Sequence, residues 1–384
     1  MKELIYLNNA ATSFPKPPNV LQAVNASLMV PPIHALRNGF GSGSNSLSKE
    51  CRTILAQLFN VPHSEQIVFT SGATESLNLA IKGLELEGKH IITSNMEHNS
   101  VLRLLKTLER NQTINLSIVP SNSLGQINWN AIKNELRPTT AAVILNHCSN
   151  VTGALNDLKT IGTALAKKNI PFIVDASQSA GLYPIDVQEM QIDILAFTGH
   201  KALYGIAGIG GIYIKKGLHL KPLKIGGTGS KSDYLYQPSS LPIYYEAGTP
   251  NYLGITSLYE GVKFIKTTGI EHIRQKIQHY VYQIRHFLAQ YPNVISYPNT
   301  AHYSFQSTLL SFSVQGLEVS DIGYLLEQNY NIVVRTGLHC APLIHESIGS
   351  APYGTVRISP SFFTTEAEIN SFLQAMKEIL TLTI

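Results

Sequence analysis

Short apolar runs rich in β-branched residues alternate with longer amphipathic segments between residues 60 and 215. Several runs are apolar at every position, which is typical of strands buried on both faces of a sheet. The expected strands are Ile67–Thr70, His90–Ser94, Ile114–Val119, Ala141–Asn146, Pro171–Asp175, Asp193–Thr198 and Gly210–Ile214. The segments of helix length between them are Glu75–Leu86, Ser100–Arg110 and Leu155–Lys168. This alternation predicts an α/β fold with a mainly parallel, seven-stranded sheet between helices, and such sheets bind ligands at the carboxyl ends of their strands.

A different pattern begins near Tyr252. Apolar residues fall on one helical stripe at Ile273, Ile277, Tyr280, Val281, Ile284, Phe287 and Leu288. Thr365 and Glu368 have the spacing of a capping box in front of another apolar helix, while Thr308–Val314 and Thr355–Ile358 read as strands. We therefore expect a large domain at residues 15–251 and a smaller α+β domain formed by residues 1–14 and 252–384.

Composition excludes several classes of protein. The chain has 384 residues, of which 44% are hydrophobic and 14% charged, so a disordered, highly charged chain is excluded. The net charge is +4, but the basic residues are scattered, and we expect no nucleic-acid partner. No uninterrupted apolar stretch suits a membrane and no signal peptide opens the chain. The three widely separated cysteines give no disulfide framework and no metal-binding pair, which favours a reducing cytoplasm and no metal.

A possible phosphate site follows the first of these strands. The segment from Ile67 to Glu75 runs from a strand through Gly72 into a helix that Thr74 and Glu75 open. The free N–H groups and the positive dipole end of a helix N-terminus suit a phosphate group. The alternative is an ordinary helix cap without a ligand.

An acid and an amine follow two other strands of the expected sheet. Asp175 closes one apolar run, and Lys201 follows the next one. Beside a phosphate site, these residue types are what pyridoxal phosphate needs, because lysine forms its Schiff base and an aspartate keeps its ring nitrogen protonated. A structural ion pair or a solvated lysine is the alternative.

A cysteine lies in a loop-like segment of the smaller domain. Cys340 is flanked by Arg335, Gly337 and His339, and nearby positive charge is what a reactive thiolate requires. Cys51 lies in a helical pattern and Cys148 lies next to a strand, so both fit the ordinary role of cysteine as a small buried hydrophobe.

Nine segments, in order along the chain, resemble the cysteine desulfurase and selenocysteine lyase family, within the class V aminotransferases of the fold-type I pyridoxal phosphate enzymes. These segments are Tyr6–Ser13, Thr70–Asn78, Glu97–Ser100, Ser149–Gly153, Asp175–Gly181, Thr198–Gly205, Tyr245–Asn251, Arg335–Ala341 and Gly354–Arg357. Each segment alone is a weak signal, whereas the ordered set is highly specific.

The resemblance implies a role for each matching residue. Lys201 would hold the cofactor and move protons, Asp175 would pair with the pyridine nitrogen, and His98 would stack on the ring and serve as acid or base. The further contacts that it implies are Ala73, Thr74, Thr198 and His200 to the phosphate, Gln178 to the ring hydroxyl, and Thr249 to the phosphate of the other subunit of a homodimer. Asn150 and Arg357 would grip the substrate carboxylate, for which a two-pronged guanidinium is suited.

Cys340 matches the family's sulfur-accepting nucleophile. The implied reaction converts L-cysteine to L-alanine, leaves the sulfur on Cys340 as a persulfide, and passes it to an acceptor protein. Selenocysteine would react by the same route. The loop that holds Cys340 has no long insertion, which resembles the group that needs a dedicated acceptor protein.

Two alternatives stay open. One is a related class V lyase or aminotransferase that acts on another amino acid, with Cys340 incidental; the other is a scaffold protein that has kept the fold and lost turnover. Two departures from the family bear on this choice. Asn8 stands where the family usually has Asp, and residues 38–46 lack the Arg and His that relatives often carry in this loop.

Overall fold

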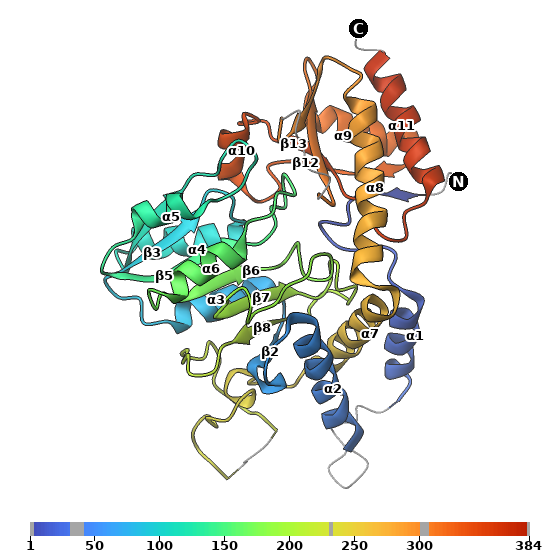
Figure 1. The fold of residues 1–384 in the computed structure, drawn as a ribbon. Coiled ribbons are helices and arrows are strands. Elements are labelled where there is room, and N and C mark those ends of the chain that lie inside the picture. The colour runs from blue at the N-terminus through green and yellow to red at the C-terminus, as the bar shows by residue number, and fades with distance from the viewer. Residues whose placement is uncertain (1–3, 31–41, 230–232, 300–306, 382–384) are drawn as a thin grey trace.

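The computed structural model describes residues 4–30, 42–229, 233–299 and 307–381, without the side chains of residues 42–46. Of the unusual loop at 38–46, residues 38–41 therefore lie outside the described residues, and the side chains of residues 42–46 are not described. A seven-stranded sheet forms the centre of one half of the molecule, and a four-stranded sheet forms the other half (Figure 1).

The seven-stranded sheet is mainly parallel, as predicted. Its strands are β2 (Ile67–Thr70), β3 (Lys89–Ser94), β4 (Ile114–Val119), β5 (Thr140–Asn146), β6 (Phe172–Asp175), β7 (Ile194–Thr198) and β8 (Gly210–Ile214). The spatial order is β2-β8-β7-β6-β5-β3-β4; β8 is antiparallel to both β2 and β7, and the other neighbouring strands are parallel. Each strand begins and ends within one residue of its predicted bounds.

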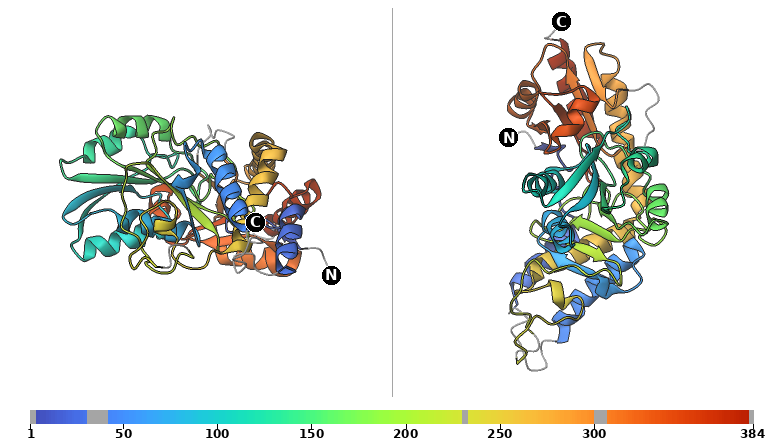
Figure 2. Two further views of the ribbon diagram at one scale, coloured as in Figure 1. Left: turned by 90° about the horizontal axis from the view of Figure 1, so that it is seen from below. Right: turned by 90° about the vertical axis from the view of Figure 1, so that its left-hand side faces the viewer.

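Helices cover both faces of this sheet, as the two views of Figure 2 show. The connecting helices are α3 (Ala73–Gly83), α4 (Asn99–Arg110), α5 (Trp129–Glu135) and α6 (Leu158–Ala166). Alternate residues of β6 pack into two different cores: Ile173 joins the core that contains α3 and α4, whereas Phe172 and Val174 join the opposite core. This explains why the strands are apolar at every position.

The helix predicted at Leu155–Lys168 is shorter than expected. It begins at Leu158, because the carboxylate of Asp157 accepts a hydrogen bond from the Thr160 amide at 3.0 Å and caps the first turn. The seven-residue helix α5 was not predicted, since its apolar stripe is too short to show a period.

The second half is an antiparallel sheet packed against helices. Its strands are β9 (Val294–Tyr297), β10 (Leu310–Val314), β12 (Arg335–Gly337) and β13 (Thr355–Ile358), in the order β12-β13-β10-β9. The helices of this half are α8 (Ile270–Leu288), α9 (Val319–Tyr330), α10 (Pro342–Ile348) and α11 (Glu366–Thr381). The predicted capping box is confirmed: the Glu368 carboxylate accepts from the Thr365 amide at 2.7 Å, and the Thr365 hydroxyl accepts from the Glu368 amide at 3.3 Å.

Both ends of the described chain lie in this half. Strand β1 (Ile5–Tyr6) pairs in parallel with β11 (Ile332–Val333), which brings the N-terminal segment to the C-terminal sheet. Helix α7 (Tyr252–Thr268) packs along α1 (Pro18–Leu28) and α2 (Ser42–Phe59), beside the large sheet (Figure 1). The division into 15–251 and 1–14 with 252–384 stays a prediction.

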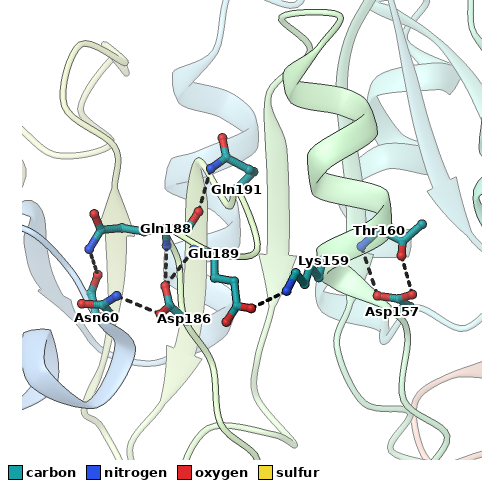
Figure 3. Close-up of polar contacts among 8 residues, drawn as sticks. All are labelled: Asn60, Asp157, Lys159, Thr160, Asp186, Gln188, Glu189 and Gln191. Atoms are coloured by element: carbon teal, nitrogen blue, oxygen red, sulfur yellow. Dashed lines mark hydrogen bonds and ion pairs between the residues drawn. The ribbon is translucent and has the colours of Figure 1, made fainter.

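A polar turn joins the end of α2 to the segment before β7 (Figure 3). The carboxylate of Asp186 accepts hydrogen bonds from the amides of Gln188 and Glu189, at 2.9 and 2.8 Å, and from the side-chain amide of Asn60, at 2.8 Å. The Gln188 side chain donates in return to the Asn60 carbonyl at 2.9 Å. Asp186 thus fixes both the turn and its contact with α2.

Substituting Asp186→Ala is expected to lower the free energy of unfolding by about 1 kcal/mol, because this carboxylate fills the role of a helix cap. Chemical denaturation followed by circular dichroism measures the loss. Glu189→Ala is the matched control, since the Glu189 side chain contributes an exposed ion pair with Lys159, for which we expect less than about half of that loss. Equal losses in the two variants would contradict the capping role.

Candidate active site

A cavity of about 360 Å³ opens at the carboxyl ends of the large sheet's strands and extends to the second sheet. All the predicted site residues except Cys340 and Thr249 line it. These lining residues are Ala73, Thr74, His98, Asn150, Asp175, Gln178, Thr198, His200, Lys201 and Arg357. The structure therefore brings together side chains that are up to 284 residues apart in sequence (357 − 73 = 284).

The turn between β2 and α3 forms one wall of the cavity. Helix α3 begins at Ala73 after Gly72, whose φ of 154° leaves the first amides of the helix at the cavity. This turn lies directly against the end of β8, since a Cβ on Gly210 would come within 2.7 Å of the Gly72 Cα. The neighbouring wall is the end of β7, where the Thr198 hydroxyl lies 3.6 Å from the position of a Cβ on Gly72. Free amides and a hydroxyl at a helix N-terminus suit a phosphate group.

Asp175 and Lys201 lie at the ends of β6 and β7. Asp175 is 5% exposed, and its carboxylate accepts from the amide and the hydroxyl of Ser177, at 2.9 and 2.5 Å. Burial lowers the pKa of Lys201 to about 8, although the Asp175 carboxylate acts against this. Neither side chain forms an ion pair within the described part of the chain. The Lys201 amine is therefore available to react with a ligand, because no ion pair in the described part of the chain engages it.

His98 caps helix α4 and faces the cavity. Its Nδ1 accepts a hydrogen bond from the Ser100 amide at 3.0 Å. Burial, helped by the charge of Lys201, lowers the pKa of His98 to about 4. The ring is therefore neutral at pH 7 and carries its proton on Nε2, since Nδ1 acts as an acceptor.

Arg357 of β13 is 1% exposed and lines the cavity. Its guanidinium donates to the carbonyl of Asn150 at 2.9 Å and to the side-chain oxygen of Asn8 at 3.3 Å, while its Nε has no partner. Burial lowers the pKa of Arg357 to about 9, and no carboxylate pairs with it among the described residues. A buried cation without a counter-ion is suited to an anionic ligand group.

The comparisons with known proteins agree with this geometry. Residues 5–372 match the family model for class-V aminotransferases. A probable cysteine desulfurase from Pyrococcus abyssi is 30% identical over 99% of this chain and 95% of its own length. The chain belongs to the cysteine desulfurases of the class-V aminotransferase family.

Solved structures of this family share the fold. A cysteine desulfurase from Thermococcus onnurineus NA1 is 29% identical, with a TM-score of 0.89 over 98% of this chain and 95% of that one. The cysteine desulfurase CsdA from Escherichia coli is 28% identical, with a TM-score of 0.88 over 99% and 95%. The predicted fold class, a fold-type I pyridoxal phosphate enzyme, is thereby confirmed.

Class-V aminotransferases depend on pyridoxal phosphate, and the residues of this cavity fit it. The α3 turn offers donors for a phosphate, Lys201 offers an amine for the aldehyde, and Asp175 offers an anion for the ring nitrogen. Gln178 donates to the Ala10 carbonyl at 2.9 Å, which holds its side chain at the cavity wall.

Cys340 lies beside the cavity. In the sequence it follows the lining residue His339 and precedes helix α10. Its thiol is half-buried and accepts a hydrogen bond from the Arg335 guanidinium at 3.1 Å. Its neighbour His339 lines the cavity, as does Arg335. The other two thiols are buried, and burial raises the pKa values of Cys51 and Cys148 to about 12. Of the three cysteines, Cys340 alone accepts a hydrogen bond from a guanidinium of the described residues.

Some features of the site differ from the sequence reasoning. Thr249 is exposed and lies outside the cavity of its own chain, so its role at a second subunit stays a prediction. Cys148 lines the cavity, although its sequence context predicts only a packing role. Glu97 is fully buried between Ser94 and Asn146, and burial raises its pKa to about 8; no sequence signal indicated this neutral carboxyl.

No helix of the described residues could cross a membrane, and no three potential ligands in that part gather around a metal position.

Proposed function

We propose that this protein is a pyridoxal phosphate-dependent cysteine desulfurase. It converts L-cysteine to L-alanine and transfers the sulfur to Cys340 and then to an acceptor protein. The observation that carries this proposal is the thiol of Cys340, hydrogen-bonded to Arg335 beside the cavity that holds Lys201 and Asp175. The names of the relatives from Pyrococcus abyssi and Escherichia coli support the same substrate.

The chain's own residues would hold the cofactor at the carboxyl edge of the sheet. The phosphate would bind the amides of Ala73 and Thr74, with Thr198 and His200 beside them, and Gln178 would reach the ring hydroxyl. His98 would lie over the ring as a neutral imidazole that can accept or return a proton. When bound, pyridoxal phosphate withdraws electrons from the substrate Cα, provided that Asp175 keeps its ring nitrogen protonated.

Lys201 would attach the cofactor and later carry the Cα proton. Because burial lowers its pKa to about 8, a useful fraction of the amine is unprotonated near neutral pH. An ordinary exposed lysine, whose pKa is about 10.4, would be almost wholly protonated there.

Cys340 would accept the sulfur atom. Its thiolate attacks the sulfur of the substrate, so that an S–S bond forms and the substrate's C–S bond breaks. The electron pair of the broken bond stays with the carbon, which takes up a proton to give alanine. L-Cysteine and one thiol thus yield L-alanine and one persulfide, with no external oxidant or reductant.

Arg357 and the side chain of Asn150 would hold the carboxylate of the substrate. Arg357→Lys is expected to lower kcat/KM for L-cysteine about 100-fold, mostly through KM, because a single ammonium cannot replace the two-pronged guanidinium. Steady-state rates of alanine formation measure this, with cofactor content as the control. An unchanged KM would show that the carboxylate binds elsewhere.

A single-turnover experiment tests the function itself. The purified holoenzyme is mixed with L-cysteine, and alanine and protein-bound persulfide are measured together; we expect equal amounts of the two. A selenocysteine lyase would release product from selenocysteine and little from cysteine, and a scaffold protein would bind the cofactor and yield no product. A class V enzyme for another amino acid would turn over that amino acid and give neither alanine nor persulfide from L-cysteine.

The assembly and the setting are part of the proposal. We propose a homodimer in which the exposed Thr249 reaches the phosphate site of the partner chain. The three cysteines are free, which supports a reducing cytoplasm. A sulfur-acceptor protein would collect the persulfide from Cys340.

A further inference from the structure

We propose that Asn150 is also a positioning residue for the loop that carries Cys340, so that one side chain sets both the substrate and the sulfur acceptor. This inference rests on the proposed function. It goes further in assigning Asn150 a contact with the protein that is made whether or not substrate is bound.

The loop that carries Cys340 is held in an unfavourable backbone conformation. His339 and Cys340 have φ values of 50° and 60°, in the left-handed region that residues other than glycine rarely adopt. Two such residues in succession cost free energy and persist only where surrounding contacts fix them. The position of the thiol therefore depends on the contacts of this loop.

Besides the contact of Arg335 with the thiol, hydrogen bonds from three other segments anchor the backbone of the loop and the His339 ring. The Cys340 carbonyl accepts from the Asn99 amide at 2.7 Å, at the start of helix α4. The His339 ring pairs through Nε2 with the Thr355 hydroxyl of β13 at 2.8 Å. The His339 carbonyl accepts from the side-chain amide of Asn150 at 2.7 Å.

Asn150 lies on a turn that is itself well fixed. The Ser149 hydroxyl accepts from the amides of Val151 and Thr152, each at 3.2 Å. The Val151 carbonyl accepts from the Ser311 hydroxyl of β10 at 2.6 Å, which ties the turn to the second sheet. Asn150 itself is 6% exposed, and its carbonyl accepts from Arg357. The turn is therefore a rigid support for a strained loop.

The chemistry of the amide allows both roles at once. The Asn150 side chain has two N–H donors, and the His339 carbonyl uses one of them. The second donor is left for a carboxylate in the cavity, which Asn150 lines. The Asn150 side-chain amide would then align both the substrate and the loop. It would thereby fix the distance from the substrate sulfur to the Cys340 thiol.

The test uses two variants that loosen the loop and one that does not. Asn150→Ala removes the bond to His339, and Thr355→Val removes the anchor of the His339 ring without touching a substrate group. Gln178→Ala is the matched control, because it removes a side-chain amide of the same cavity whose hydrogen bond goes to the Ala10 carbonyl. Amide hydrogen exchange of residues 338–341 is measured on each purified protein without substrate, alongside kcat and KM for L-cysteine.

We expect exchange at residues 338–341 to become about fivefold faster in Asn150→Ala and in Thr355→Val, the effect of one lost hydrogen bond, and to stay unchanged in Gln178→Ala. We also expect kcat to fall in Thr355→Val with KM unchanged, and both constants to suffer in Asn150→Ala. Wild-type exchange rates in Asn150→Ala would overturn the inference. Since exchange is measured without turnover, a failure of the proposed reaction would leave this result intact.

Discussion

Replacing Lys201 by alanine is expected to lower alanine formation from L-cysteine by at least about 10³-fold, because the variant loses both the covalent link to the cofactor and the group that moves the Cα proton. Borohydride reduction of the wild-type protein, followed by peptide mapping, should find a pyridoxyl group on Lys201. The same treatment of the variant should find none. A colourless wild-type protein without this adduct would refute the cofactor and, with it, the function.

The pH dependence of cofactor attachment checks the same amine from another side. Only the unprotonated amine attacks an aldehyde, and burial lowers the pKa of Lys201 to about 8. In cofactor-free protein, the rate of attachment should therefore rise with pH and level off above about 8. A rate that still climbs steeply at pH 10 would mean that the lysine is solvated.

Substituting Cys340→Ser is expected to abolish protein-bound persulfide and to reduce alanine formation to below about one per cent of wild type, because the sulfur then has no acceptor. The hydroxyl has nearly the same size, so the loop and the contact with Arg335 should survive. Persulfide is measured by labelling with and without reductant, and alanine is measured in the same samples.

Cys148→Ala provides the matched control for that experiment. Cys148 lines the cavity beside which Cys340 lies, but burial raises the pKa of Cys148 to about 12, which disfavours its reactive thiolate form. We expect this variant to form persulfide as the wild type does. Unchanged alanine formation in Cys340→Ser would instead favour a class V enzyme in which Cys340 is incidental.

The large sheet was predictable because its strands carry their own signal. Ile173 packs on one face while Phe172 and Val174 pack on the other, which is why a short run that is apolar throughout indicated a strand covered on both faces. Helices were harder to delimit, as the late start of α6 at Leu158 shows, because a capping carboxylate rather than the apolar pattern decides where the helix begins.

The candidate site was predictable where its residues follow strands. Asp175 and Lys201 both come directly after apolar runs, and parallel strands bring such ends to one edge. The contacts of Asn8 with Arg357 and of Asn150 with His339 could not be predicted from pattern, because each joins segments far apart in sequence. In the sequence, Asn8 stands out only as a departure from the family. Its neutral amide leaves the charge of Arg357 without a counter-ion, whereas an aspartate at this position would neutralise that charge.

The pairing of β1 with β11 has a consequence for how the protein is made. Ile5 and Tyr6 leave the ribosome long before their partners Ile332 and Val333, which are translated hundreds of codons later. Arg357 is translated later still, and until then the side-chain oxygen of Asn8 lacks the guanidinium from which it accepts a hydrogen bond. The proposed substrate clamp can therefore assemble only after Arg357 has been translated.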